Sequence, residues 1–418
     1  MLISLLLLPF ILHAQQNNTL SLTKAYELAI QNYPLVKQRD LLKQTADINI
    51  NNLSKNFLPQ FNISGQATYQ SDVTQVKIPL PGVTITPPSK DQYKILADIN
   101  QLIYDGGAVT EQKKILQLND AAEQQKIEVE LYKLKERVNQ LYLGVLFLDE
   151  QLKQTDLIKK DINNGIKKTE ALVNNGVAFR SSVNVLKAEL LKAEQRTIEV
   201  KTSRKGLIDV LSLFINAPLA ENVQLQKPVI EIEIPDNDIK RPEIKLFDTQ
   251  EKLLNGQYKL IDARNKPKAS AFLQSGYGKP GLNLFKNEFA FFYITGVRLN
   301  WNFGNLYTRK NDRQLIDINK KTIDVQKNMF LLNTSAALKQ QLSEIDKLKQ
   351  LINTDNEIID LRIKVKVAAK AQLENAVITA NDYLREINAE DQARQSLITH
   401  EVQLLQAQIN YQTILGKQ

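Results

Sequence analysis

The sequence of 418 residues predicts a mainly α-helical protein with four amphipathic β-strands, built from one structural unit that occurs twice. Three observations support this prediction. Apolar residues recur at alternating spacings of three and four over long stretches, which is typical of coiled-coil helices. Four shorter stretches alternate apolar and polar residues, which is typical of strands with one wetted face. The order helix, strand, strand, long helix, helix then appears a second time.

Composition narrows the classes of function before any element is assigned. The chain carries 54 Lys and Arg against 46 Asp and Glu, and 43% of its residues are hydrophobic, enough for a large core. Because basic and acidic residues are interleaved along helical stretches without a basic block, they indicate solvated helix surfaces, and we expect no nucleic-acid partner. The absence of cysteine excludes disulfides, thiolate metal sites and cysteine nucleophiles.

The two histidines argue against an enzyme. His13 lies in the first apolar run, and His400 stands alone in the last expected helix. No Ser-His-Asp set, metal-ligand cluster or phosphate loop can be assembled around them. We therefore expect no catalytic residue, no cofactor and no metal site.

The first residues read "MLISLLLLPFILHAQQ", and the apolar run from Leu2 to Leu12 is too short for a membrane-spanning helix. It has the length of a secretory signal core, although the positive charge that usually precedes such a core is missing. We expect export, with residues 1–14 as the signal peptide. No later stretch is apolar for long enough to form a transmembrane helix.

The first copy of the unit begins with residues 15–56, which are predicted to be helical with a kink at Pro34. Residues 57–104 alternate in two stretches, "FLPQFNISGQATY" and "YKILADINQLIY", and are predicted to form a β-hairpin around a proline-rich segment. Residues 105–215 are predicted to form a long helical hairpin. Residues 216–242, which contain four prolines, are expected to be an irregular linker.

The long helix over residues 108–174 is predicted from a regular apolar seam. Its first members are Leu131, Leu134, Val138, Leu141, Val145, Leu148 and Leu152. The seam keeps its register across Asn164-Gly165, so we expect the helix to continue there at a cost of about 1 kcal/mol for the glycine. Asn174-Asn175-Gly176 predicts the helix end, because glycine takes the left-handed conformation without strain. A second coil starts near Ser181.

The second copy repeats this order. Residues 243–266 are predicted to be helical, residues 267–303 to form a second β-hairpin, and residues 304–418 to form a second long helical hairpin. Pro59 and Pro267 head equivalent strands, and the helical turns at residues 176 and 376 correspond.

The predicted strands have the length and the amphipathic pattern of membrane-spanning β-strands. Strands of about 10 to 15 residues with one apolar and one polar face have the size to cross an outer membrane. In lipid they must close into a barrel, and four strands are too few to enclose a lumen, so several chains must contribute. Aromatic residues near the strand ends are candidates for the membrane–water interfaces: Phe57, Tyr69, Tyr93, Tyr104, Phe289, Tyr293 and Trp301.

In this order and spacing, the chain resembles the TolC-like outer membrane efflux protein family. The resemblance covers nearly the whole mature chain and is carried by five segments: "SLTKAYELAIQNYPLVK", "FLPQFNISGQATY", "INQLIYDGGAV", "NNGVAFRSSVNVLKAE" and "NAVITANDYLREINAE". It implies a homotrimer whose twelve-stranded barrel lies in outer membrane lipid and whose long coiled-coil α-helical barrel extends into the periplasm. It further implies a porin-like exit duct of a tripartite efflux pump, which passes small molecules such as drugs from a periplasmic adaptor and an inner-membrane transporter to the outside.

The resemblance also implies functional residues at the helical turns. Carried over by position, the adaptor contacts are Gly176, Val177, Ala178, Ala376, Val377 and Ile378. Ala376 stands where the family often has glycine. The alternative for Val177 and Ile378 is ordinary coil packing. Candidates for the polar links that close the periplasmic gate are Arg180, Arg362, Asp382 and Arg385.

Two other functions remain open from the sequence. A duct of the same fold can serve type I protein secretion, because a wide aqueous channel passes small molecules and unfolded protein alike. A soluble periplasmic coiled-coil scaffold with a small β-cap explains the heptads equally well, but not the polar strand faces. Extraction with carbonate distinguishes the scaffold from either kind of duct, because it removes a scaffold from membranes and leaves a barrel protein in place.

Overall fold

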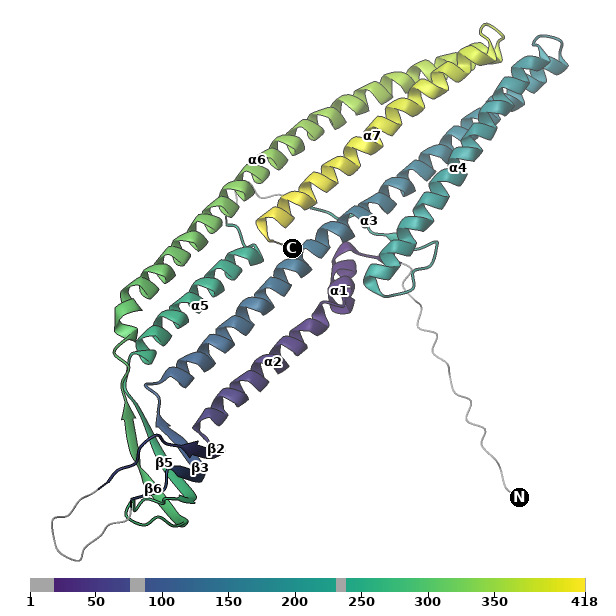
Figure 1. Cartoon of the computed structure of the whole chain (residues 1–418). Coiled ribbons are helices and arrows are strands. Elements are labelled where there is room, and N and C mark those ends of the chain that lie inside the picture. Colours follow the sequence, from purple (N-terminus) through teal and green to yellow (C-terminus); the bar gives the residue numbers. More distant parts are fainter. Residues whose placement is uncertain (1–18, 76–86, 231–237, 418) are drawn as a thin grey trace, which may run out of the picture. The chain divides into compact units, whose positions relative to one another are not determined.

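The computed structural model describes residues 19–75, 87–230 and 238–417 (Figure 1). The expected signal peptide, residues 1–14, lies outside the described residues. Two compact units can be separated, the sheet unit (residues 37–126 and 243–329) and the helical unit (up to residue 36, 127–242 and from residue 330). Among the described helices, none has both the length and the apolar character that crossing a membrane requires.

The predicted duplication is confirmed. The first copy consists of α1 (Leu22–Asn32), α2 (Val36–Ser54), β2 (Gln60–Tyr69), β3 (Asp91–Tyr104), α3 (Ala108–Asn174) and α4 (Arg180–Ile215). The second copy consists of α5 (Pro242–Arg264), β5 (Lys268–Lys279), β6 (Ala290–Asn300), α6 (Asn305–Glu374) and α7 (Ala380–Leu415). The helices α3 and α6 each contribute residues to both units.

Two details of the first copy differ from the prediction. The described part of the stretch predicted over residues 15–56 does not form one kinked helix, because Pro34 follows an extended Tyr33 and separates α1 from α2. The linker over residues 216–242 is not irregular throughout. Its strand β4 (Gln224–Leu225) pairs in parallel with β1 (Thr19–Leu20), a contact between segments about 200 residues apart that no local pattern reveals.

The four long strands form one antiparallel sheet of order β2-β3-β5-β6 in the sheet unit. The register places Ile63 opposite Ala97, Ala97 opposite Ser275, and Ser275 opposite Tyr293. Because side chains alternate between the faces of a sheet, this row assigns every strand residue to one of two faces. The helix-side ends of the hairpins turn directly into α3 and α6.

Equivalent side chains start these two helices. The Asp105 carboxylate accepts hydrogen bonds from the N–H groups of Gly107 (2.8 Å) and Val109 (2.5 Å). In the second copy, Asn302 Oδ1 accepts from the N–H of Gly304 at 2.9 Å. The buried Asp105 thus satisfies donors that the first turn of α3 leaves unpaired.

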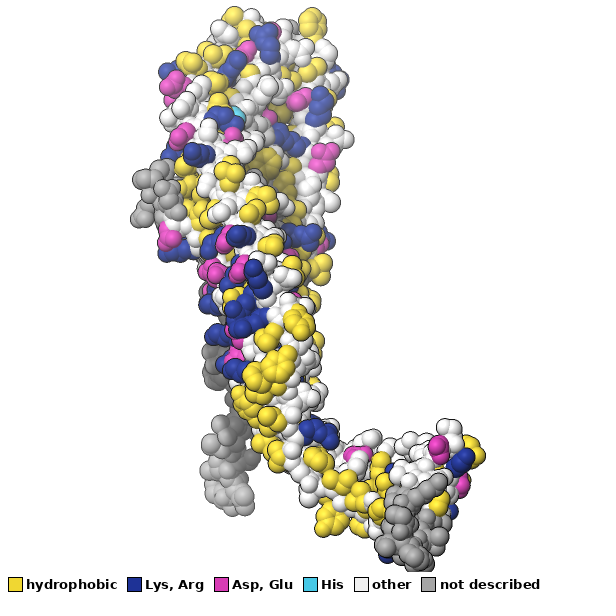
Figure 2. Space-filling model, turned by 60° about the vertical axis from the view of Figure 1, so that its left-hand side comes forward, with side chains coloured by type: hydrophobic (Ala, Val, Ile, Leu, Met, Phe, Trp, Pro, Cys, Tyr) yellow, Lys and Arg dark blue, Asp and Glu magenta, His cyan; other side chains and the backbone are white. Residues whose placement is uncertain are grey.

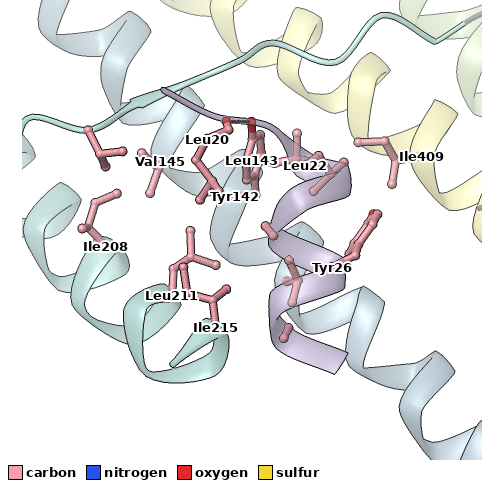
Figure 3. Packing of buried hydrophobic residues seen from close by; sticks show 14 of the residues in the cluster. Leu20, Leu22, Tyr26, Tyr142, Leu143, Val145, Ile208, Leu211, Ile215 and Ile409 are labelled. Atoms are coloured by element: carbon pink, nitrogen blue, oxygen red, sulfur yellow. Dashed lines mark hydrogen bonds between the residues drawn. The ribbon is translucent and has the colours of Figure 1, made fainter. Parts of the chain in front are cut away.

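The largest core cluster of the helical unit surrounds Tyr142 of α3, which is fully buried (Figure 3). Leu20 and Leu22 approach it from the N-terminal segment, and Ile208 and Leu211 approach it from α4. Its hydroxyl lies 2.6 Å from the carbonyl oxygen of Leu20 and 2.8 Å from that of Gln226. The phenol therefore satisfies backbone groups beside the short β1–β4 pair while its ring fills the core.

A second cluster explains the glycine inside α3. Gly165 lies in uninterrupted helix, as predicted, and a Cβ added there would lie 3.1 Å from Cε1 of Tyr383. Tyr383 of α7 is 2% exposed and packs with Ile162, Leu186 and Ile387. The glycine costs α3 helix propensity but makes room for this ring between the two helical hairpins.

Candidate functional site

The sheet presents one apolar face to its surroundings. Five large apolar residues lie on the face that contains Ala97: Phe61, Ile63, Ile95, Val297 and Leu299. They are 61–72% exposed. Figure 2 shows further hydrophobic side chains at the surface of the molecule. A continuous apolar face of this kind requires an apolar partner, either lipid or protein.

The opposite face is polar only in part. On β2 it carries Gln60, Asn62, Ser64, Gln66 and Thr68, as the sequence predicts. On β5 and β6, however, Phe272, Phe292 and Ile294 lie on this face. The face that the sequence suggests to be polar is therefore uncharged and polar along β2, and it carries large apolar side chains on β5 and β6.

The predicted interface aromatics fall into two rows at the ends of the strands. Tyr69, Tyr93 and Phe289 lie at the loop ends, where the Phe289 ring stacks on Tyr277 with centroids 5.7 Å apart. Tyr104, Trp301 and Phe57 lie at the helix ends. Phe57, Phe289 and Trp301 stand just outside the strands. Tyr293, the fourth residue of β6, lies inside the apolar face rather than at its edge.

The separation of the rows matches a membrane. Tyr93 pairs with Lys279 and, beyond a register shift in β3, Tyr104 pairs with Ala269, so the two aromatic residues are ten steps of β5 apart, or about 34 Å along the strand. At the tilt of about 40° that is usual in barrels, this corresponds to a height of roughly 26 Å, close to the apolar band of about 25 Å in outer-membrane barrels.

Both helical turns have the same geometry. Val177 N–H donates to the carbonyl of Leu172 at 2.8 Å and Gly176 N–H to that of Val173 at 3.0 Å. In the second turn, Val377 N–H donates to Gln372 at 2.8 Å and Ala376 N–H to Leu373 at 3.0 Å. These are Schellman motifs, in which the residue after the helix takes a left-handed conformation.

Ala376 adopts this left-handed conformation with φ of 56°, where Gly176 has φ of 71°. This conformation is about 1–2 kcal/mol less stable for alanine, because its Cβ comes too close to the carbonyl oxygen that follows it. Ala376→Gly is expected to stabilise the turn by about 1 kcal/mol, seen as roughly fivefold slower hydrogen exchange of the Val377 amide. Gly176→Ala is the matched change in the opposite direction and should speed the exchange of Val177. Faster exchange in Ala376→Gly would contradict the strain at this position.

The turns expose apolar side chains. Val177 is 57%, Phe179 83% and Val377 69% exposed. Ile378 is half-buried and packs on the cluster around Tyr383. Phe179 was not among the residues that the sequence indicated. It occupies the N-cap position of α4 without a side-chain cap, whereas Thr379 at the equivalent position forms a capping box, and this contrast was the available signal.

Two of the four gate candidates, Arg362 and Arg385, meet at the carboxylate of Glu386, and no ion pair links the candidates directly among the described residues. Asp382 forms the capping box with Thr379, whose hydrogen bonds lower the pKa of the Asp382 carboxyl. Arg362 lies 3.6 Å and Arg385 3.2 Å from carboxylate oxygens of Glu386. Arg180 is the exposed first residue of α4. Asp382 thus has a local structural role in this protomer.

A buried charge cluster, which sequence reasoning did not identify, connects three helices of the helical unit. Lys366 Nζ on α6 lies 2.8 Å from Asp161 Oδ2 on α3 and 2.5 Å from Glu390 Oε2 on α7. Arg394 Nε lies 2.7 Å from the other oxygen of Glu390, which is 4% exposed as a residue. Burial alone would raise the pKa of Glu390, but the hydrogen bonds from Lys366 and Arg394 outweigh it and lower that pKa.

The cluster predicts a loss of stability in acid. A carboxyl whose folded pKa is lowered stabilises the fold above its unfolded pKa of about 4.3, and this contribution disappears as pH falls below that value. Glu390→Gln should lower the melting temperature at pH 7, and it should reduce the further drop in melting temperature between pH 5 and pH 2, both measured by helical circular dichroism. Glu130→Gln removes an exposed partner of Lys133 and serves as the control, with little effect expected. An unchanged acid dependence in Glu390→Gln would contradict this role.

Comparison with known proteins agrees with this geometry. A family model described as outer membrane efflux protein matches residues 25–206, from α1 through both strands of the first hairpin and the first helical turn. These residues belong to the outer membrane efflux protein family. No curated protein is similar enough in sequence to be matched with the chain.

Solved structures extend the likeness to the second copy. VceC from Vibrio cholerae has 14% sequence identity and a TM-score of 0.67, over 94% of this chain and 96% of its own. The MtrE channel of Neisseria gonorrhoeae in its open state has 14% identity and a TM-score of 0.67, over 94% and 88%. The CmeC channel of Campylobacter jejuni has 13% identity and a TM-score of 0.64, over 95% and 85%. The chain therefore has the outer membrane efflux protein fold over nearly its whole length.

Proposed function

We propose that three copies of the chain form the exit duct of a tripartite efflux pump in the outer membrane. The observation that carries this proposal is the exposed apolar face of a sheet with only four strands. Lipid can cover that face, but backbone groups at the edges of β2 and β6 stay unpaired in lipid until neighbouring copies close the sheet. The structural likeness to VceC, an outer membrane protein, and to MtrE and CmeC, which are outer membrane channels, supports the location and the role as a conduit.

In this proposal, residues 57–104 and 267–303 are the transmembrane hairpins, and the helical hairpins extend into the periplasm. The turns at residues 176 and 376 then face the inner membrane. Their exposed Val177, Phe179 and Val377 offer an apolar contact to a periplasmic adaptor protein, which an inner-membrane transporter drives. The duct moves small molecules without chemistry of its own. A soluble scaffold is disfavoured, since it would leave the apolar sheet face in water.

Fractionation and reconstitution test this proposal. The chain is expected to resist carbonate extraction from membranes, to have the mass of three chains after detergent purification, and to conduct ions in planar bilayers. A folded monomer that stays in solution without detergent would overturn the proposal. If the chain inserts into membranes but conducts no ions, the role as a duct is wrong, and only the assignment of the sheet to the membrane remains.

A further inference from the structure

The apolar half of the second sheet face has a defined construction. The register pairs Phe292 with Gly276 and Phe272 with Gly296. A Cβ at Gly276 would lie 2.7 Å from Phe292 Cζ and 2.7 Å from Leu96 Cδ2, and one at Gly296 would lie 3.2 Å from Phe272 Cε1. The two rings therefore lie across glycines of the neighbouring strand and form a flat apolar surface on β5 and β6.

A positively charged side chain, that of Arg298, lies on this surface. The Arg298 guanidinium stands 4.7 Å from the centroid of the Phe272 ring. The strand register pairs Arg298 with Ser270, one step from Phe272 on the same face. A guanidinium held over a ring keeps its charge and its planar set of donors, because stacking uses its face and leaves its edge free for an anion.

The charge of the whole face favours anions. Of the charged residues in the four strands, Lys94, Lys268 and Arg298 share this face with Asp98. Gln274 Nε2 donates a hydrogen bond to Asp98 Oδ1 at 2.6 Å, so this carboxylate is already engaged. On this face, Lys268 and Arg298 lie on β5 and β6 together with the rings, whereas β2 carries amide and hydroxyl side chains only.

We propose that Phe272, Phe292, Leu96 and Arg298, here called the β5–β6 lane, bind amphipathic aromatic anions, that is, ring compounds with a carboxylate or sulfonate. The ring of such a molecule stacks on Phe272 or Phe292, and its anionic group meets the free edge of Arg298. This inference rests on the proposed function, which makes this face the wall of the channel. It assigns to that wall a chemical preference among the molecules that pass it.

Equilibrium dialysis of 2-naphthoate against the trimer in nanodiscs tests the lane, with empty nanodiscs measuring partition into lipid. We expect saturable binding to the trimer. Arg298→Gln and Phe272→Leu should each raise the Kd roughly 3- to 10-fold, because each removes one of the two interactions. In Phe272→Leu, the leucine side chain still covers Gly296, so we expect the sheet to keep its fold. Hexanoate, an anion without a ring, should bind at least several-fold more weakly than naphthoate.

Lys94→Gln is the matched control, because it removes the same charge from the same face outside the lane and should change the Kd less than twofold. If Lys94→Gln and Arg298→Gln weaken naphthoate binding equally, the lane is wrong, and the positive charge of the whole face attracts the anion without a specific site. No saturable binding, or binding that Phe272→Leu and Arg298→Gln leave unchanged, would show that the rings only cover glycines. In each case, conductance of the same trimer in planar bilayers would show that the channel itself is intact.

Discussion

Ile63→Arg is expected to prevent stable insertion of the protein into the outer membrane. Ile63 lies near the middle of β2 on the apolar face and is 64% exposed, so lipid is its surrounding in the proposed barrel. An arginine at the midplane of a barrel's lipid face costs about 2–4 kcal/mol, and each of three copies pays this cost. The measurement is the fraction of folded trimer in outer membrane preparations, determined by electrophoresis of unheated samples.

Ser64→Arg provides a control one residue away. Ser64 lies opposite Leu96 on the other face, where water is expected and an arginine is tolerated. The trimer yield should therefore fall in Ile63→Arg and stay near the wild-type level in Ser64→Arg. If both variants insert equally well, the assignment of the two faces is wrong.

The double substitution Val177→Asp with Val377→Asp is expected to reduce efflux at least tenfold while the trimer stays inserted. Both valines are exposed at the helical turns, so the change buries no carboxylate within the protomer. A carboxylate placed in an apolar docking contact loses its hydration without gaining a partner, which costs about 2 kcal/mol or more at an interface centre. Retention of a fluorescent dye in whole cells measures the loss.

Val229→Asp is the matched control for the turns. Val229 lies in the linker, is 90% exposed, and receives the same change in charge and size. Dye efflux should remain at the wild-type level in this variant. Normal efflux in the double turn variant, with the trimer present, would mean that the turns do not dock an adaptor.

Much of the fold follows from local periodicity. The seam predicts α3 to its last residue, Asn174, because 3- and 4-residue spacing can be satisfied only by a helix buried along one side. Alternation predicts the faces of all four strands within a few residues. The boundaries at Phe57 and Trp301 were less accurate, since an aromatic residue beside a strand continues the alternating pattern without joining the hydrogen-bonded ladder.

The site was predicted less completely. Gly176 allows its turn to be predicted from the sequence, because glycine is the usual residue in the left-handed conformation. Ala376 adopts the same geometry, although alanine disfavours it. Its turn is held by the packing of Leu373, Ala380 and Ile378 around Tyr383, which is a tertiary effect. Phe179 gave only a weak signal, an apolar residue where a cap is expected.

By itself, the sequence determined the order of elements, the duplication and the residues of the apolar strand face, because these depend on residues that are neighbours along the chain. Only the tertiary structure decided which residues meet across long separations. Lys366 meets Asp161 from 205 positions away, and the rings of Phe272 and Phe292 lie over glycines that strand register brings beside them. Such contacts depend on the pairing of distant segments, and no local period encodes that pairing.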